Sequence, residues 1–268
     1  MIHLKSITLR EYNERESSSF PFTLEIVRSL KELEFNSPVT FFVGENGSGK
    51  STVIEALACA IGSITVGNES VKTDRSLSAV RKLTQYMRLS WQKRTHKGFF
   101  LRAEDFFSYA KNMRQMQEQL QEEMEARGKE AGKRSKLAAA LTRLPYAGQI
   151  SAIKQRYGEG LDARSHGEGF MALFQTRFVP GGLYLLDEPE AALSPTRQLT
   201  FIAALKQMVE EDSQFIIATH SPIILAFPDA TILSFDGGTI QQVQYEQLEH
   251  VNLTRDFLQN PHAFLRHL

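Results

Sequence analysis

The glycine-rich stretch Val39–Thr52, VTFFVGENGSGKST, combines residue types and a spacing that predict a specific chemistry. Gly44, Gly49, Lys50 and Ser51 fit the pattern G-x-x-x-x-G-K-[ST], between an apolar run and a helical pattern. In such a loop the backbone N–H groups point at phosphate oxygens, and the following helix adds its positive end. The lysine is a point charge for the β- and γ-phosphates, and the serine hydroxyl is a ligand for Mg²⁺. The stretch therefore predicts a nucleotide-binding site.

Most of this loop is expected to contact the nucleotide, because its backbone curls around the phosphates. The expected binding residues are Glu45, Asn46, Gly47, Ser48, Gly49, Lys50, Ser51 and Thr52. Lys50 is also a candidate catalytic residue.

Two adjacent carboxylates follow a second apolar run. Leu183–Leu186 reads as a buried parallel strand, and Asp187 and Glu188 stand at its carboxyl end, where open α/β sheets place their ligands. Side chains at the end of a strand diverge, so one acid can face a metal and the other the γ-phosphate. A further apolar run, QFIIATHS, carries His220 at its tip.

The order of four motifs resembles that of ABC-type ATPase heads, including the structural-maintenance-of-chromosomes and RecF-like branches. These motifs are Gly44–Ser51, Ser165–Glu168, Leu183–Glu188 and Thr219–Ser221. The chain more closely resembles small stand-alone bacterial predicted ATPases of the AAA-family type, which share GFFLRAE, SHGE, LDEPEAALSP and ATHSP. The resemblance covers nearly the whole chain.

This resemblance implies an ATPase with ATP and Mg²⁺ as its ligands. Asp187 would then hold the metal together with Ser51. Glu188 would orient and deprotonate the attacking water, and His220 would donate a hydrogen bond to the γ-phosphate. Phosphoryl transfer depends on such positioning and charge stabilisation.

The segment Ser165, His166, Gly167 and Glu168 resembles the ABC signature, which grips the γ-phosphate of ATP bound to the other subunit. It implies a head-to-tail homodimer with ATP sandwiched between two copies. His166 stands where the family usually has glycine, and Arg164 replaces a leucine. A glycine-rich helix cap is the alternative reading of this segment.

The run GFFLRAED lies where the family has its Q-loop, but it contains no glutamine. Glu104 is our candidate for that place, as a ligand on the metal side of the site. Contact between Arg102 and a phosphate is the alternative.

The elements that must position these residues predict an α/β fold. We expect a P-loop NTPase of the ABC-ATPase-head type, with a mostly parallel central sheet, an N-terminal antiparallel layer and a helical insertion. The chain is expected to form one domain, residues 1–268, with an insertion or signature subdomain at 107–160. Expected strands lie at 2–9, within 20–35, and at 39–43, 98–107, 183–187 and 214–218, with a hairpin around 236–238. Expected helices lie at 50–61, at 195–210, after 169 and in the C-terminal tail, with a helical pair to about 144 ended by Pro145 and Gly148.

Composition narrows the class of protein. The 268 residues contain one cysteine, Cys59, which excludes an internal disulfide and is expected to pack within the helix after the loop. No run of 18 apolar residues occurs, and the start of the sequence lacks the apolar core of a signal peptide. We expect a soluble cytoplasmic protein without membrane insertion.

The net charge is zero but uneven along the chain. Residues 71–156 hold nineteen Lys and Arg against eight Asp and Glu, a balance of +11, and the remainder carries −11. A basic segment favours a polyanion such as nucleic acid as partner, although such charges can also simply solvate helices. The alternatives are a nucleotide-gated switch for a protein partner, including a toxin or defence effector, a transporter energy subunit, and a non-enzymatic binding protein.

Overall fold

The computed structural model describes residues 1–66, 70–132, 135–157 and 166–266. It divides into two compact units. The first contains Met1–Ala103 and Phe178–Leu268, and the second contains Glu104–Arg177.

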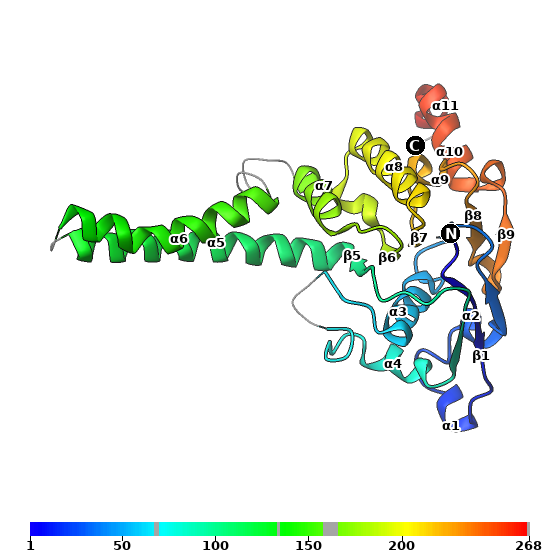
Figure 1. Ribbon diagram of the computed structural model, residues 1–268. Helices are drawn as coiled ribbons and strands as arrows, with labels where there is room; N and C mark the ends of the chain where they lie inside the picture. Colours follow the sequence, from blue (N-terminus) through cyan, green and yellow to red (C-terminus); the bar gives the residue numbers. More distant parts are fainter. Residues whose placement is uncertain (67–69, 133–134, 158–165, 267–268) are drawn as a thin grey trace. The chain divides into compact units, whose positions relative to one another are not determined.

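A six-stranded sheet forms the centre of the first unit (Figure 1). In spatial order its strands are β5 (Phe100–Arg102), β6 (Leu183–Asp187), β7 (Gln214–Ala218), β3 (Val39–Val43), β8 (Thr231–Ser234) and β9 (Gln241–Val243). Only the β8–β9 pair is antiparallel in this sheet. The carboxyl ends of β3, β6 and β7 therefore meet at one edge, where Asp187 and Phe42 are both in register with Ala218.

A three-stranded antiparallel sheet forms a second layer of this unit. Its order is β2 (Glu32–Glu34), β1 (Leu4–Leu9), β4 (Met87–Trp91). The buried side chain of Gln214, at the start of β7, joins the two sheets. Its Oε1 accepts the N–H groups of His3 and Leu4 at 2.8 Å each, and its Nε2 donates to the carbonyl of Leu4 at 3.0 Å.

Both faces of the central sheet are covered, as a parallel sheet requires. On one face Leu183 and Leu185 of β6 belong to a core shared with the antiparallel layer and with α3 (Lys50–Ile61). On the other face Tyr184 stacks on Phe215, with ring centroids 5.0 Å apart. The alternation along β6 explains its continuous apolar sequence.

The remaining helices of the first unit are short apart from α8 and α10. They are α1 (Glu14–Ser17), α2 (Glu25–Ser29), α4 (Ser78–Thr84), α8 (Pro195–Glu210), α9 (Pro222–Leu225), α10 (Glu249–Gln259), α11 (Pro261–Leu265) and the 3-10 turns η1 (Pro189–Ala192), η2 (Asp236–Gly238) and η3 (Tyr245–Gln247). Ser194 is the N-cap of α8 and Pro195 its first residue, as predicted. The Ser194 side chain, however, makes no capping hydrogen bond.

The second unit is helical. It contains α5 (Ala103–Gly132, which begins at the unit boundary), α6 (Lys136–Tyr157) and α7 (His166–Arg177). The ring of Phe170 meets those of Phe106 and Phe174 edge to face, with centroids 4.6 Å apart in each pair. Three buried aromatic side chains thus join α5 and α7.

The predicted fold class is confirmed: the mostly parallel sheet, the antiparallel layer and the helical insertion are all present. One N-terminal prediction is wrong, because residues 25–29 form α2 and not a strand. The buried side chains of α2, Ile26 and Val27, are followed by buried Leu30. This spacing of apolar residues fits one face of a helical turn as well as a strand. Short apolar runs of this kind do not distinguish the two.

Two predicted boundaries around the insertion are also wrong. The expected strand 98–107 shrinks to β5, and helix begins at Ala103. Pro145 lies inside α6, which continues to Tyr157. A proline removes its own amide hydrogen bond and displaces one carbonyl, so a long helix can continue through it. The unit Glu104–Arg177 contains the predicted segment 107–160, whose role as a signature subdomain stays a prediction.

In the described parts of the chain, no helix combines the length and apolar character that a membrane span requires.

Candidate functional site

The phosphate-binding loop leads from β3 into α3. Gly49, the N-cap of α3, has a φ of 99°, a backbone conformation that side chains with a Cβ rarely adopt. A Cβ at this position would also lie 2.6 Å from Cγ2 of Ile26. The loop therefore needs glycine here both for its turn and for its contact with α2. Glu45, Asn46, Gly47 and Ser48 form the loop itself, and Ser51 and Thr52 lie in the first turn of α3.

Lys50 lies against the loop that precedes it. Its Nζ donates to the carbonyls of Gly44 at 2.6 Å and Glu45 at 2.9 Å. The residue is 5% exposed, and burial lowers its pKa, while the Glu188 and Asp187 carboxylates oppose that shift. The ammonium group is thus held beside the backbone positions where phosphate oxygens are expected.

Asp187, at the end of β6, lies beside this helix start. The Ser51 Oγ donates to Asp187 Oδ1 across 3.3 Å. Asp187 is 8% exposed, and burial raises its pKa to about 7. A buried carboxylate next to a hydroxyl is a set of oxygen donors that suits Mg²⁺. Within the described residues, no group of three or more Asp, Glu, His or Cys could hold a metal by itself.

Glu188 has a different environment from its neighbour. Its side chain is 45% exposed, and its backbone is left-handed, with φ 50° and ψ 53°. The N–H of Glu188 donates to the carbonyl of Ala218 at 2.9 Å, which fixes the turn to β7. The two acids therefore diverge, one into the protein and one toward solvent. A non-glycine residue in this conformation is strained, and such strain clusters at functional sites.

His220 lies two residues beyond β7, near Glu188. Its Nε2 is 4.0 Å from Glu188 Oε1, and its backbone N–H donates to Glu190 Oε1 at 2.6 Å. Burial lowers the pKa of His220, as does the charge of Lys50, while Glu188 opposes the shift. The neutral imidazole that these effects favour can donate one hydrogen bond.

Two further acids at this site have no role predicted from the sequence. Glu190 holds the backbone of His220, and burial raises its pKa. Asp236 accepts the N–H of Glu45 at 2.8 Å through Oδ1. The sequence Asp-Gly-Gly predicted only the turn between β8 and β9, and no local signal relates it to a loop 191 residues away.

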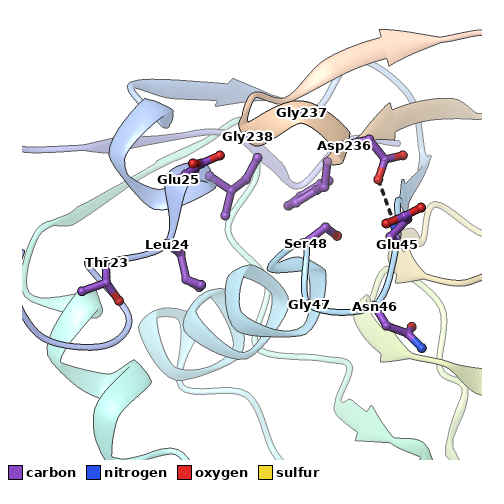
Figure 2. Close-up of a pocket in the computed structure, with 12 residues that line it drawn as sticks. Thr23, Leu24, Glu25, Glu45, Asn46, Gly47, Ser48, Asp236, Gly237 and Gly238 are labelled. Atoms are coloured by element: carbon purple, nitrogen blue, oxygen red, sulfur yellow. Dashed lines mark hydrogen bonds between the residues drawn. The ribbon is translucent and has the colours of Figure 1, made fainter.

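Several cavities adjoin the loop, and two of them share Glu45 and Asn46 in their lining. Figure 2 shows the first, of about 420 Å³, with Glu25 and Gly238 on one side and Glu45 and Asn46 on the other. It is lined by residues 23–26, 45–48 and 235–238. The second, of about 540 Å³, is lined by Glu45, Asn46, Glu188 and His220. The loop thus separates a nucleoside-sized cavity from the mouth that holds Glu188 and His220.

Several predicted site residues belong to the second unit. Ser165 lies outside the described residues, while His166, Gly167 and Glu168 open α7 and Glu104 lies in the first turn of α5. Their predicted roles stay predictions.

Arg102 has a structural role in the first unit. It is buried, and its guanidinium donates to Asp74 Oδ2 at 2.7 Å and to Ser76 Oγ at 3.0 Å. Glu55 Oε1 of α3 lies 3.5 Å away. Arg102 thus ties β5 to the segment before α4 and to α3, and the alternative of a phosphate contact stays a prediction.

Two regions of the sequence match known families. Residues 22–144 match a family described as an AAA domain, and residues 169–226 match one described as an AAA domain, putative AbiEii toxin, type IV TA system. No curated protein sequence matches the chain.

Solved structures resemble the chain at low sequence identity. The Smc head domain of Pyrococcus furiosus, with an extended coiled coil and bound to the C-terminal domain of ScpA, is 12% identical, with a TM-score of 0.49 over 96% of this chain and 100% of that one. The ATP-binding cassette of an ABC transporter in its ADP conformation is 16% identical, with a TM-score of 0.49 over 96% of each chain. The cbiO1 protein of Clostridium perfringens, part of the ABC transporter complex cbiONQ, is 17% identical, with a TM-score of 0.45 over 100% of each chain.

The first family match contains the phosphate-binding loop, and the second contains the strand that ends in Asp187 and Glu188. Both halves of the site therefore fall within AAA-domain sequence. The chain is a P-loop ATPase, as its motifs predict.

Proposed function

We propose that this ATPase hydrolyses ATP to ADP and phosphate by in-line attack of water, with Mg²⁺, at an interface between two copies of the chain. The observation that carries the proposal is the divergence of Asp187 and Glu188 beside the loop. The buried acid is paired with Ser51 and the exposed one lies near His220. One carboxylate is available for a metal and the other for a water molecule.

Ser51 and Asp187 would hold Mg²⁺ through their oxygens. When bound, the metal would neutralise charge on the phosphates. Two protein oxygens suffice for such a site, because Mg²⁺ keeps several waters and takes further ligands from the phosphates. Glu104 remains a candidate third ligand.

Three side chains would perform the remaining steps. Lys50 would exchange its bonds to the Gly44 and Glu45 carbonyls for phosphate oxygens, and its charge would offset the charge that develops in the transition state. Glu188 would accept a proton from the attacking water, and His220 would donate to the γ-phosphate from Nε2. Both lie at the exposed mouth where water can enter.

The nucleoside would occupy the cavity of about 420 Å³ in Figure 2, which is within the range of small-molecule sites. The Thr23 hydroxyl and the Glu25 carboxylate can hydrogen-bond base or ribose, and Leu24 offers an apolar contact. The triphosphate would then run along residues 45–48 toward Glu188.

A second copy would complete the mouth at Glu188 and His220. That mouth is open, and the chain itself lines it with Glu45, Asn46, Glu188 and His220. The resemblance to ABC-type heads supplies Ser165, His166, Gly167 and Glu168 of the second copy as the covering residues.

The test compares wild type with Glu188→Gln. We expect Glu188→Gln to lower kcat at least 100-fold, to leave ATP affinity within about threefold and to give an ATP-dependent dimer. The measurements are phosphate release, ATP binding and mass in solution, each with and without Mg²⁺. Glu210→Gln, an exposed acid at the end of α8, is the matched control.

Each part of the proposal can fail separately. Unchanged turnover in Glu188→Gln would remove the role of Glu188, and full turnover after chelation would remove Mg²⁺. A strictly monomeric Glu188→Gln with ATP bound would refute the shared interface.

The nucleoside cavity has its own test. Glu25→Ala is expected to weaken ATP binding about three- to tenfold, the worth of one or two hydrogen bonds, without changing the affinity for inorganic triphosphate. Glu32→Ala, an exposed acid on β2, is the control. An equal loss for triphosphate would place the nucleoside elsewhere.

A nucleotide-gated switch for a protein partner is a second candidate function. The match of residues 169–226 to a family described as a putative AbiEii toxin favours it. This function predicts that Glu188→Gln with ATP retains a protein partner that wild type with ADP releases. Turnover that is stimulated by nucleic acid, with binding that weakens steeply as salt rises, would instead favour a nucleic-acid partner for the basic segment.

A further inference from the structure

A second histidine, His250, lies beside His220. The two ring centroids are 6.5 Å apart and the ring planes meet at 70°, an edge-to-face arrangement. Both residues line a cavity of about 700 Å³ that begins at Gly44 and Glu45 of the phosphate-binding loop. His250 comes from the first turn of α10, and no motif in the sequence marks it.

The start of α10 is held against the segment that carries His220. The Tyr245 hydroxyl, just before α10, donates to the carbonyl of Pro222 at 3.0 Å. Leu248 and Val251, on either side of His250, are buried. Packing therefore sets the position of the His250 ring. The bond from Tyr245 to Pro222 fixes that ring relative to the segment after β7.

Each of the two imidazoles has a nitrogen without a hydrogen-bond partner within the described residues. The Nε2 atoms of His220 and of His250 are shielded from solvent and have no hydrogen-bond partner within the described residues. Leaving a buried polar atom without a partner costs free energy that an apolar side chain of similar shape would avoid. The Nε2 of His220 also lies 4.0 Å from Glu188 Oε1, beside the phosphate-binding loop, which indicates that its partner arrives with the bound ligand.

Two contacts act on His220, one on its backbone and one on its ring. Its backbone N–H is fixed by Glu190, but this bond leaves the side chain free to rotate. The edge-to-face contact with His250 restricts that rotation. Asp236 and Lys50 are the charged groups that act most strongly on His250, so its surroundings belong to the same site.

We propose that His250 is a positioning residue for ATP hydrolysis: its ring holds the His220 imidazole with Nε2 toward the Glu188 mouth, where the γ-phosphate is expected. The inference rests on the proposed role of His220. A well-aimed donor contributes about 100- to 1,000-fold in rate, and a loosely held one loses part of that factor.

The test is a double-mutant cycle on the full chain. ATP turnover is measured for wild type, His250→Ala, His220→Ala and the double variant, with thermal unfolding as a check of folding. We expect His250→Ala, which removes the ring, to lower kcat about tenfold and to change KM less than about twofold. In the His220→Ala background the same change should alter kcat less than about twofold, because its effect passes through His220.

His250→Phe, which keeps an aromatic ring against His220, is expected to recover about half of the loss on a logarithmic scale, and it carries the test if His250→Ala does not fold. His262→Ala, an exposed histidine of α11, is the matched control. An equal loss of kcat from the His250 change in both backgrounds would mean a merely structural role and would overturn the inference. Wild-type kcat for both His250 variants, with a low kcat for His220→Ala, would overturn the inference on His250 but leave the proposed role of His220 intact. Unchanged kcat for His220→Ala would refute the role of His220 in the proposed function and the inference with it.

Discussion

The phosphate-binding loop and the acidic edge of the sheet contribute to one site but are built differently. The Nζ hydrogen bonds of Lys50 end in the loop at Gly44 and Glu45, six and five residues away. The edge combines Asp187 and Glu188 after β6 with His220 after β7, and its hydrogen bonds join these separate segments. The bonds of Lys50 are therefore local, with one long-range bond from the Glu45 N–H to Asp236, whereas the edge depends on the pairing of parallel strands.

The two regions also differ in the charged group that each one buries. The loop holds a cation whose pKa burial lowers, beside carbonyls that already accept its hydrogens. The edge holds a buried acid, Asp187, whose pKa burial raises to about 7. Both groups are costly to bury without a ligand, and a triphosphate with a cation would satisfy both.

Of the changes that distinguish the two regions, removal of the loop lysine should have the largest effect on ATP affinity. Lys50→Ala deletes a charge-assisted contact to two phosphates, and we expect ATP affinity to fall about 100-fold, equivalent to about 2.7 kcal/mol. Titration of ATP binding measures this loss. Lys206→Ala, an exposed lysine of α8, should bind as wild type does. Undiminished affinity in Lys50→Ala would show that the loop backbone alone holds the phosphates.

Removal of the side-chain hydrogen bonds at the start of β7 should instead lower the stability of the sheet that carries the acidic edge. Gln214→Leu removes three hydrogen bonds that join β1 and β7 and leaves the N–H groups of His3 and Leu4 unpaired. We expect the free energy of unfolding to fall by about 2–4 kcal/mol, measured by urea denaturation. Gln242→Leu, on the exposed strand β9, is the control. A stability within about 0.5 kcal/mol of wild type would mean that the two sheets are held together by apolar packing alone.

Cys59 should have the smallest effect, because it lies in α3 beyond the residues of the site. Burial raises its pKa to about 11, so only about one thiol in a thousand is ionised at pH 8. We expect alkylation at pH 8 to be at least 100-fold slower than for a free cysteine, and to rise about tenfold per pH unit up to about pH 11 if the fold persists. ATP turnover in Cys59→Ala should stay within about twofold of wild type. Rapid alkylation at pH 8 would show that α3 opens to solvent.

Much of this arrangement could be predicted because its signals are local. The loop, α3, β6 and β7 each have a sequence pattern that specifies their own conformation, and AAA-domain matches cover the loop and the acidic strand end. Short or exceptional elements were less predictable. The segment 25–29 satisfies two periodicities, and α6 continues through Pro145 although the residue type suggested a stop.

The phosphate-binding loop, the order of the motifs along the chain and the pair of acids can be read from the sequence, because these features depend on neighbouring residues. The folded structure adds that Asp187 is buried while the Glu188 side chain is about half exposed, that Asp236 accepts the amide of Glu45, and that His250 contacts His220. Contacts between segments that lie tens to hundreds of residues apart follow from sheet register and helix packing, which no local spacing encodes.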